Sequence, residues 1–192
     1  MDVSKIADRV AIDMHTHVHI SASSPPADDP YLTAAGAYFR TGPMRRSMEQ
    51  IDAHYRERNM ACVVFSVDTE TADGRVQVPG EEIAEFAAAH DDVIIPFGSV
   101  DHCRRPFNIK HLRELAAVGV RGFKFHPATQ RFFPDDRRFY PVYEAIAEAG
   151  LPVVFHTGQT GIGEGMRGGG GVRLKYANPI YLDDVAADFP DL

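Results

Sequence analysis

The segment at residues 11–17 ends in a carboxylate and two histidines at alternating positions. Side chains of a β-strand alternate between its two faces, so we expect Asp13, His15 and His17 to point the same way. Two imidazoles placed like this can bind one metal ion. A single histidine in an apolar segment is more often a core residue than a ligand. The motif therefore indicates a metal site only if further histidines end later strands.

Two later apolar segments also end in histidine, at residues 120–126 and 151–156. In parallel α/β folds the carboxyl ends of the strands lie on one side, where ligand sites form. His126 and His156 are therefore expected to converge with the first pair. Three imidazoles and a carboxylate, with one position left for water, are the composition of a catalytic zinc site. The alternative is a set of unrelated buried histidines.

The segment at residues 120–126 also alternates in polarity. Phe123 and Phe125 share one face, and Lys124 and His126 share the other. If the phenylalanines pack against covering helices, Lys124 points into the centre of the sheet, where an unpaired charge is costly. This lysine is therefore a further candidate for the site.

The elements that carry these residues alternate between strand and helix five times. Apolar, β-branched runs predict strands, and apolar residues at three- and four-residue spacing predict amphipathic helices. Such alternation indicates parallel strands with helical crossovers, either in a doubly wound sheet or in a barrel, and periodicity does not decide between them. The predicted strands are residues 11–15, 60–67, 93–100, 120–126 and 151–156, and the predicted helices are residues 47–59, 80–90, 108–118, 138–149 and a last one that starts at Asn178.

Two long connections have no such periodicity. Residues 19–43 are rich in Ser, Ala, Pro, Asp and Gly, and we expect a loop over the metal site. Residues 158–171 contain four consecutive glycines but lack the Gly-Lys-Ser/Thr ending of a phosphate-binding loop. We expect a mobile loop over the site there as well.

Composition restricts the class of protein. The chain has 192 residues, of which 44% are hydrophobic and 24% charged, which is ordinary for a globular domain, and we expect a single domain over residues 1–192. A net charge of −7 argues against nucleic acid as a partner and favours small molecules. Cys62 and Cys103 do not suggest a disulfide framework, and no apolar run approaches the ~18 residues of a membrane span. We therefore expect a cytoplasmic protein that does not bind membranes.

Three motifs resemble the amidohydrolase superfamily. They are Asp13-Met14-His15-Thr16-His17, Gly122-Phe123-Lys124-Phe125-His126-Pro127 and His156-Thr157-Gly158, and their order and spacing match nearly the whole chain. The most similar branch is the amidohydrolase-related group (amidohydrolase 2), which includes aminocarboxymuconate-semialdehyde decarboxylase-like enzymes. The resemblance implies a TIM (β/α)8 barrel, a homodimer, and a divalent metal, usually zinc, with His15, His17 and His156 as ligands.

The sequence departs from the family at its end. The family also uses a histidine after the sixth strand and an aspartate after the eighth, whereas this sequence ends at Leu192, where the sixth strand would begin. Five-eighths of a barrel would leave two strand edges unpaired. We therefore expect about five of the eight βα units, truncated before the sixth strand.

Five further residues are candidates for a role at the predicted site. Lys124 can be a carbamylated metal bridge, as in the binuclear branch, but an ion pair or substrate contact is the preferred interpretation. His126 is a ligand or positions the substrate, and Asp13 orients a histidine or touches the metal. Arg40 and Arg167 lie in the long connections and are candidates to bind a substrate carboxylate.

The predicted function is a metal-dependent hydrolase that acts on a small, carboxylated organic substrate through a zinc-activated water. A non-oxidative decarboxylase (carboxy-lyase) on the same site is the alternative, because the residues present serve both reactions. TatD-like metal nucleases also start with an Asp-x-His-x-His motif, but they usually carry a Gly-Glu-Ile-Gly-Leu-Asp-like motif where this chain has residues 121–126. A metal-binding module without activity is the remaining alternative.

Overall fold

A computed structural model describes residues 3–23, 29–42, 45–75, 77–104 and 107–192. Its five strands are all parallel and follow the order of the chain. Backbone pairing forms one sheet of three strands and one of two, and a bridge between Gly98 and Phe123 joins them. The Gly98 N–H donates to the Gly122 carbonyl (2.9 Å), and the Lys124 N–H donates to the Gly98 carbonyl (2.8 Å). The strands are β1 (Ile12–His17), β2 (Ala61–Phe65), β3 (Ile94–Pro96), β4 (Phe123–Phe125) and β5 (Val153–Phe155).

The last three strands are shorter than predicted, with three residues each. β3 ends at Pro96, which has no N–H, although the Phe97 N–H still donates to the Val64 carbonyl (2.8 Å). Gly122 precedes β4 at a point where a Cβ would lie 2.3 Å from the Phe97 ring, so only glycine allows this approach of the two segments. The apolar runs are therefore longer than the hydrogen-bonded strands that they contain.

The long helices confirm the predicted crossovers. Ser47 and Gln50 form a capping box at the start of α2, and Gly150 follows α7 with a positive φ of 63°. The last predicted helix is divided, because Asn178 caps a 3₁₀ turn that precedes α8. These helices are α2 (Met48–Glu57), α4 (Gly80–Ala89), α5 (Phe107–Ala117), α7 (Tyr140–Glu148) and α8 (Asp183–Asp188).

The prediction that residues 19–43 form an uninterrupted loop is wrong, because they contain α1 (Pro30–Phe39). The Asp29 carboxylate accepts the N–H groups of Tyr31 (2.8 Å) and Leu32 (3.2 Å), and Pro30 occupies the first turn, where its missing N–H costs nothing. The Asp29-Pro30 pair thus marks the start of this helix, although the composition of residues 19–43 is typical of a loop. Short elements complete the chain: α3 (Glu70–Asp73), α6 (Pro127–Gln130), η1 (Val3–Lys5), η2 (Arg137–Phe139), η3 (Arg167–Gly171), η4 (Leu174–Ala177) and η5 (Pro179–Leu182).

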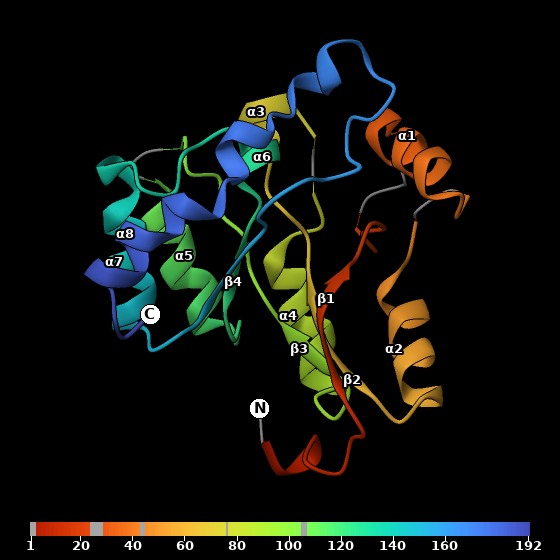
Figure 1. Cartoon of the computed structure of the whole chain (residues 1–192). Helices are drawn as coiled ribbons and strands as arrows, with labels where there is room; N and C mark the ends of the chain where they lie inside the picture. The colour runs from red at the N-terminus through yellow and green to blue at the C-terminus, as the bar shows by residue number, and fades with distance from the viewer. Residues whose placement is uncertain (1–2, 24–28, 43–44, 76, 105–106) are drawn as a thin grey trace.

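The core has two sides. Helices α2, α4, α5, α7 and α8 pack on the outer side of the strands, and Phe123 and Phe125 belong to this outer core, as the alternation predicts. A separate apolar layer, which includes Ala61, Val63 and Phe65, lies on the opposite side of the strands. In Figure 1 the carboxyl ends of β1 and β2 point towards α1, α3, α6 and the blue glycine-rich segment, and the N-terminal turn lies at the opposite end.

The two outer strands each have an open edge. Among the described residues β1 pairs only with β2, and β5 pairs only with β4. Ile12 and Met14 of β1 are accordingly 43% and 50% exposed. Within the same described part of the chain, no helix is long and apolar enough to cross a membrane.

Candidate metal centre

The two histidines of β1 meet at their Nε2 atoms, which lie 3.0 Å apart. The Phe65 ring packs against both imidazoles, with centroids 5.3 Å and 4.7 Å away. Burial lowers the pKa of His15, and burial together with His15 lowers the pKa of His17 to about 3. Both rings are therefore neutral near pH 7, which is the form that binds metal ions.

The expectation that Asp13 shares a face with the two histidines is wrong, because β1 contains a bulge. Asp13 pairs with Cys62 of β2, and Thr16 pairs with Val64 of β2. Between these two pairs β1 therefore contains one residue more than β2. Asp13 and Thr16 consequently lie on the same side of the strand, facing α2. The Asp13 carboxylate accepts the Tyr55 hydroxyl (2.5 Å) and the backbone N–H of His15 (2.9 Å), and it does not line the pocket described below.

His126 and His156 stack on each other, with centroids 3.9 Å apart and an interplanar angle of 7°. Burial lowers the pKa of His156 to about 4 and that of His126 well below its ordinary value. The Nδ1 atom of His126 accepts the Thr129 N–H (3.4 Å), so the proton of this neutral ring resides on Nε2 and can be donated in a hydrogen bond. The Nε2 atom of His156 is buried and has no hydrogen-bond partner among the described residues.

Lys124 brings a positive charge close to these rings. Its side chain is buried, and no hydrogen bond or ion pair joins its ammonium group to a described residue, although this group lies 5.3 Å from the centre of the Phe65 ring. Burial lowers the pKa of Lys124 to about 8. Its charge in turn lowers the pKa values of all four histidines.

These histidines line a pocket of about 540 Å³. The sequence predicted His15, His17, His126 and His156 near one another, and the structure brings all four to this pocket. Arg40 and Arg167, the arginines expected to bind a substrate carboxylate, lie outside the lining of this pocket. Arg40 is the exposed C-terminal cap of α1 and Arg167 is exposed at the start of η3, and neither lines the pocket.

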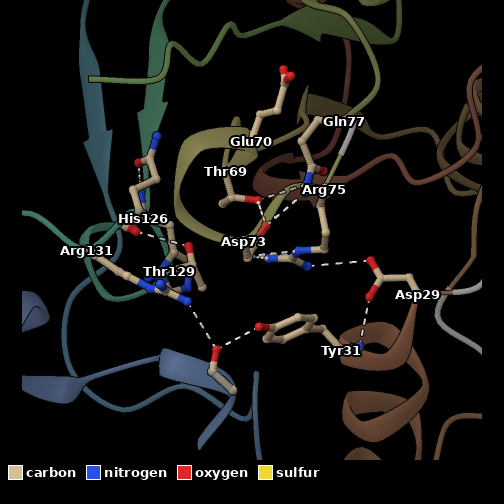
Figure 2. A network of polar contacts seen from close by, with 12 residues as sticks. Asp29, Tyr31, Thr69, Glu70, Asp73, Arg75, Gln77, His126, Thr129 and Arg131 are labelled. Atoms are coloured by element: carbon tan, nitrogen blue, oxygen red, sulfur yellow. Dashed lines mark hydrogen bonds and ion pairs between the residues drawn. The ribbon is translucent and has the colours of Figure 1, made fainter. Parts of the chain in front are cut away.

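Two other arginines, Arg45 and Arg75, do line the pocket. Arg75 donates to Asp73 from Nε (3.0 Å) and Nη2 (2.8 Å), forms an ion pair with Asp29 (3.5 Å), and lies over the Tyr31 ring. Figure 2 shows how this arginine connects the segment after α3 to the start of α1. Because two carboxylates already compensate Arg75, it stabilises the pocket wall rather than providing an uncompensated charge.

The glycine-rich segment packs on the same wall. The Tyr31 hydroxyl donates to the Gly170 carbonyl (2.6 Å), and Arg131 donates to the same oxygen (3.3 Å), as Figure 2 shows. A Cβ on Gly161 would lie 2.5 Å from the Phe39 ring, so α1 and this segment are in close contact. With Thr160 and Ile162 in the lining, described residues of both connections border the same pocket as the histidines, whereas residues 24–28 and 43 of the first connection lie outside the described residues.

The donor set fits a divalent metal such as zinc. Two nitrogens bound to one tetrahedral zinc ion lie roughly 3.3 Å apart, since each Zn–N bond is about 2.0–2.1 Å, and the observed Nε2 separation of 3.0 Å is close to this. Two lone-pair nitrogens at that distance repel each other unless a proton or a cation lies between them. The buried, unpaired Nε2 of His156 provides a third nitrogen at the same pocket.

Sequence reasoning missed His19, Arg45 and Arg75. His19 continues the alternation of His15 and His17 by one step beyond β1, and its ring stacks on His17 at 6.1 Å. It lines the pocket, and its Nδ1 is buried without a hydrogen-bond partner in the described part of the chain. The repeated spacing could have indicated it, whereas no local pattern distinguishes Arg45 or Arg75 from a surface arginine.

Comparison with known families gives one extended match. A family model described as amidohydrolase matches residues 12–192. No curated protein matches the sequence significantly.

Solved structures show the same fold. An uncharacterised TIM-barrel protein from Bordetella bronchiseptica is 22% identical, with a TM-score of 0.67 over 95% of this chain and 65% of that one. The 5-carboxyvanillate decarboxylase of Sphingomonas paucimobilis is 18% identical, with a TM-score of 0.61 over 97% and 66% of the respective chains. An IDCase of Metarhizium anisopliae is 16% identical, with a TM-score of 0.55 over 100% and 65%. The chain thus spans about two thirds of the length of these proteins and has the fold of a partial TIM barrel.

Proposed function

Because the chain belongs to the amidohydrolase family, whose members are enzymes, we propose that it is a metal-dependent hydrolase acting on a small, carboxylated organic molecule. The observation that supports this most strongly is the approach of the His15 and His17 Nε2 atoms to 3.0 Å in a pocket that also contains the unpaired Nε2 of His156. His15, His17 and His156 would hold the metal. When bound, zinc would acidify a water molecule and polarise a carbonyl group of the substrate.

The remaining residues suit an anionic substrate. Lys124 brings positive charge to the pocket region, and Asp29, the one carboxylate in the described lining, is paired with Arg75. The Nε2–H of His126 can donate a hydrogen bond to a substrate oxygen. α1 and the glycine-rich segment contribute to the wall of this pocket, and each of these polar contacts would strengthen as the substrate displaces water from it.

Decarboxylation at the same site is the second candidate. It requires a group that delivers a proton to the carbon that loses carbon dioxide. Lys124, with a pKa of about 8, is protonated near pH 7 and interacts electrostatically with the four histidines, which supports it as that donor, although it stands outside the lining of the pocket. One of the structures with the same fold is a 5-carboxyvanillate decarboxylase. The family match favours both candidates over a TatD-like nuclease.

Metal analysis tests the site. We expect the purified protein, loaded with zinc or manganese and then desalted, to retain the metal at the histidines. The double variant His15→Ala/His17→Ala should lose that metal. His111→Ala is the matched control, because His111 lies on α5 away from the pocket and its removal should change nothing. Equal metal contents in all three proteins would contradict the proposal.

A substrate panel separates the two reactions. Amides, esters and lactones that carry a carboxylate would be assayed for hydrolysis, and phenolic carboxylic acids would be assayed for release of carbon dioxide. Hydrolysis without carbon dioxide release is the expected result, and the reverse would establish the carboxy-lyase. We further propose a homodimer, for which sedimentation should give twice the mass of the chain.

A further inference from the structure

A second group of metal-binding side chains lies outside the histidine pocket, in the segment that follows β3. Asp101, His102 and Cys103 each offer one ligand atom, and these atoms all lie within 4.8 Å of one another. The Nε2 atom of His102 is 3.1 Å from the Cys103 Sγ. The group borders a cavity of about 440 Å³ that shares no lining residue with the histidine pocket.

The local structure fixes two of the three ligands before any metal binds. The Asp101 carboxylate accepts the N–H of Cys103 (2.9 Å) and the N–H of Thr71 (2.8 Å), which orients its oxygens and leaves lone pairs on both. The His102 ring packs against Phe132 and Phe139, with centroids 4.3 Å and 4.8 Å away. A site whose ligands are held in place loses little conformational entropy when it binds.

The charges behind the group favour a cation. Asp68 accepts the backbone N–H of Asp101 (3.0 Å), and burial, with Asp101 nearby, raises the pKa of Asp68. Glu70 is paired with Arg104, whose Nε is 4.0 Å from the Asp101 carboxylate. On this side three carboxylates therefore face one arginine.

Arginines and one further carboxylate also line this cavity. Asp136 is paired there with Arg138, and Arg131 also lines the wall. Arg138 lies close enough to Cys103 for the two groups to interact electrostatically, and Asp136 compensates the charge of this arginine next to the ligand atoms. Cys103 is exposed, which gives a metal a route from solvent and leaves room for a water ligand.

We propose that Asp101, His102 and Cys103 form a second metal site that binds a thiophilic divalent cation such as zinc. The combination of a thiolate, an imidazole and a carboxylate is typical of zinc and cobalt and unsuited to magnesium or calcium. On binding, the Cys103 thiol releases its proton to solvent and its sulfur forms the bond to the metal.

Cobalt(II) binding to the full-length chain tests this proposal, because only a thiolate ligand gives strong sulfur-to-cobalt charge-transfer absorption. We expect this absorption in the wild type and in His15→Ala/His17→Ala, which lacks the first site. Cys103→Ser should abolish it, and His102→Asn should weaken cobalt binding at least 10-fold. Cys62→Ala is the matched control, since the Cys62 thiol is buried in the core and its loss should leave the absorption unchanged.

A thiol assay provides a second measurement that does not depend on cobalt. One thiol, that of Cys103, should react rapidly with a disulfide reagent in the metal-free protein, and zinc should slow this reaction at least 10-fold. Absence of charge transfer in the wild type, retention of it in Cys103→Ser, or no protection by zinc would each overturn the proposal. Binding of a single cobalt ion per chain, with charge-transfer absorption, would support the site at Cys103 and contradict the metal site at the histidines.

Discussion

The side chain of Lys124 is buried, and its ammonium group has no anionic partner among the described residues, which makes its charge destabilising. The unfolded chain binds this proton below a pH of about 10.5, but the folded protein binds it only below about 8. The free energy of unfolding therefore rises between these two values as the pH increases. Below pH 8 the charge costs about 3 kcal/mol. A protein retains such a residue where the charge serves binding or catalysis.

Replacement of Lys124 should change stability and activity in opposite directions. We expect Lys124→Met to raise the free energy of unfolding by about 2–3 kcal/mol at pH 7, with the gain shrinking above pH 8, and to lower activity at least 100-fold. Urea unfolding at pH 7 and pH 10 with chelator present measures the first effect. Lys110→Met is the control, because Lys110 is 78% exposed and should change stability by less than about 0.5 kcal/mol. Similar effects of the two substitutions would contradict this account.

Strand β1 carries the histidines, and its bulge decides which way they face. The Tyr55 hydroxyl contacts both Asp13 (2.5 Å) and Thr16 (2.9 Å), one on each side of the bulge. We expect Tyr55→Phe to destabilise the protein by about 1–2 kcal/mol, because Asp13 and Thr16 lose a partner, and to weaken zinc binding about 10-fold. Calorimetry of zinc binding and urea unfolding measure these effects. Tyr38→Phe alters an exposed ring on α1, and an equal loss there would argue against a specific role of Tyr55.

The contact between α1 and the glycine-rich segment depends on Gly170. This residue has a φ of +58°, and a Cβ on it would lie 2.6 Å from the Tyr31 ring. Gly168 has a similar φ of +64°, but a Cβ on it would have only the end of an arginine side chain within 4 Å. Gly168→Ala therefore measures the effect of the strained backbone conformation without a packing clash. We expect Gly170→Ala to separate the two segments and to increase hydrogen exchange in α1, whereas Gly168→Ala should not. Equal exchange in the two variants would show that the packing is unimportant.

For the whole molecule, the sequence predicts the alternation of strands and helices and the convergence of four histidines, because each depends on local periodicity and on a general rule of parallel sheets. It does not predict the side to which Asp13 points, because a bulge adds one residue to a strand without a sequence signature. It also does not select Arg75 over Arg40, because the positions of arginines in long connections are set by distant partners such as Asp29 and Asp73.

The clustering of neutral histidines should make the whole fold sensitive to acid. Burial lowers the pKa of His17 to about 3, and it lowers those of His19 and His156 to about 4. The unfolded chain takes up these protons near pH 6.5, so the free energy of unfolding should fall as the pH drops from 6.5 towards 4. Each such histidine contributes up to about 1.4 kcal/mol per pH unit.

Urea unfolding of the metal-free protein at pH 7, 6 and 5 measures this slope. We expect His17→Gln/His156→Gln to reduce this slope by about two protons relative to the wild type, because glutamine does not titrate. Zinc should add stability at pH 7 through binding to the folded state only, and this gain should decline towards pH 5 as protons compete for the same nitrogens. A slope that is the same in this double variant and in the wild type would mean that the buried histidines do not remain neutral in the folded protein.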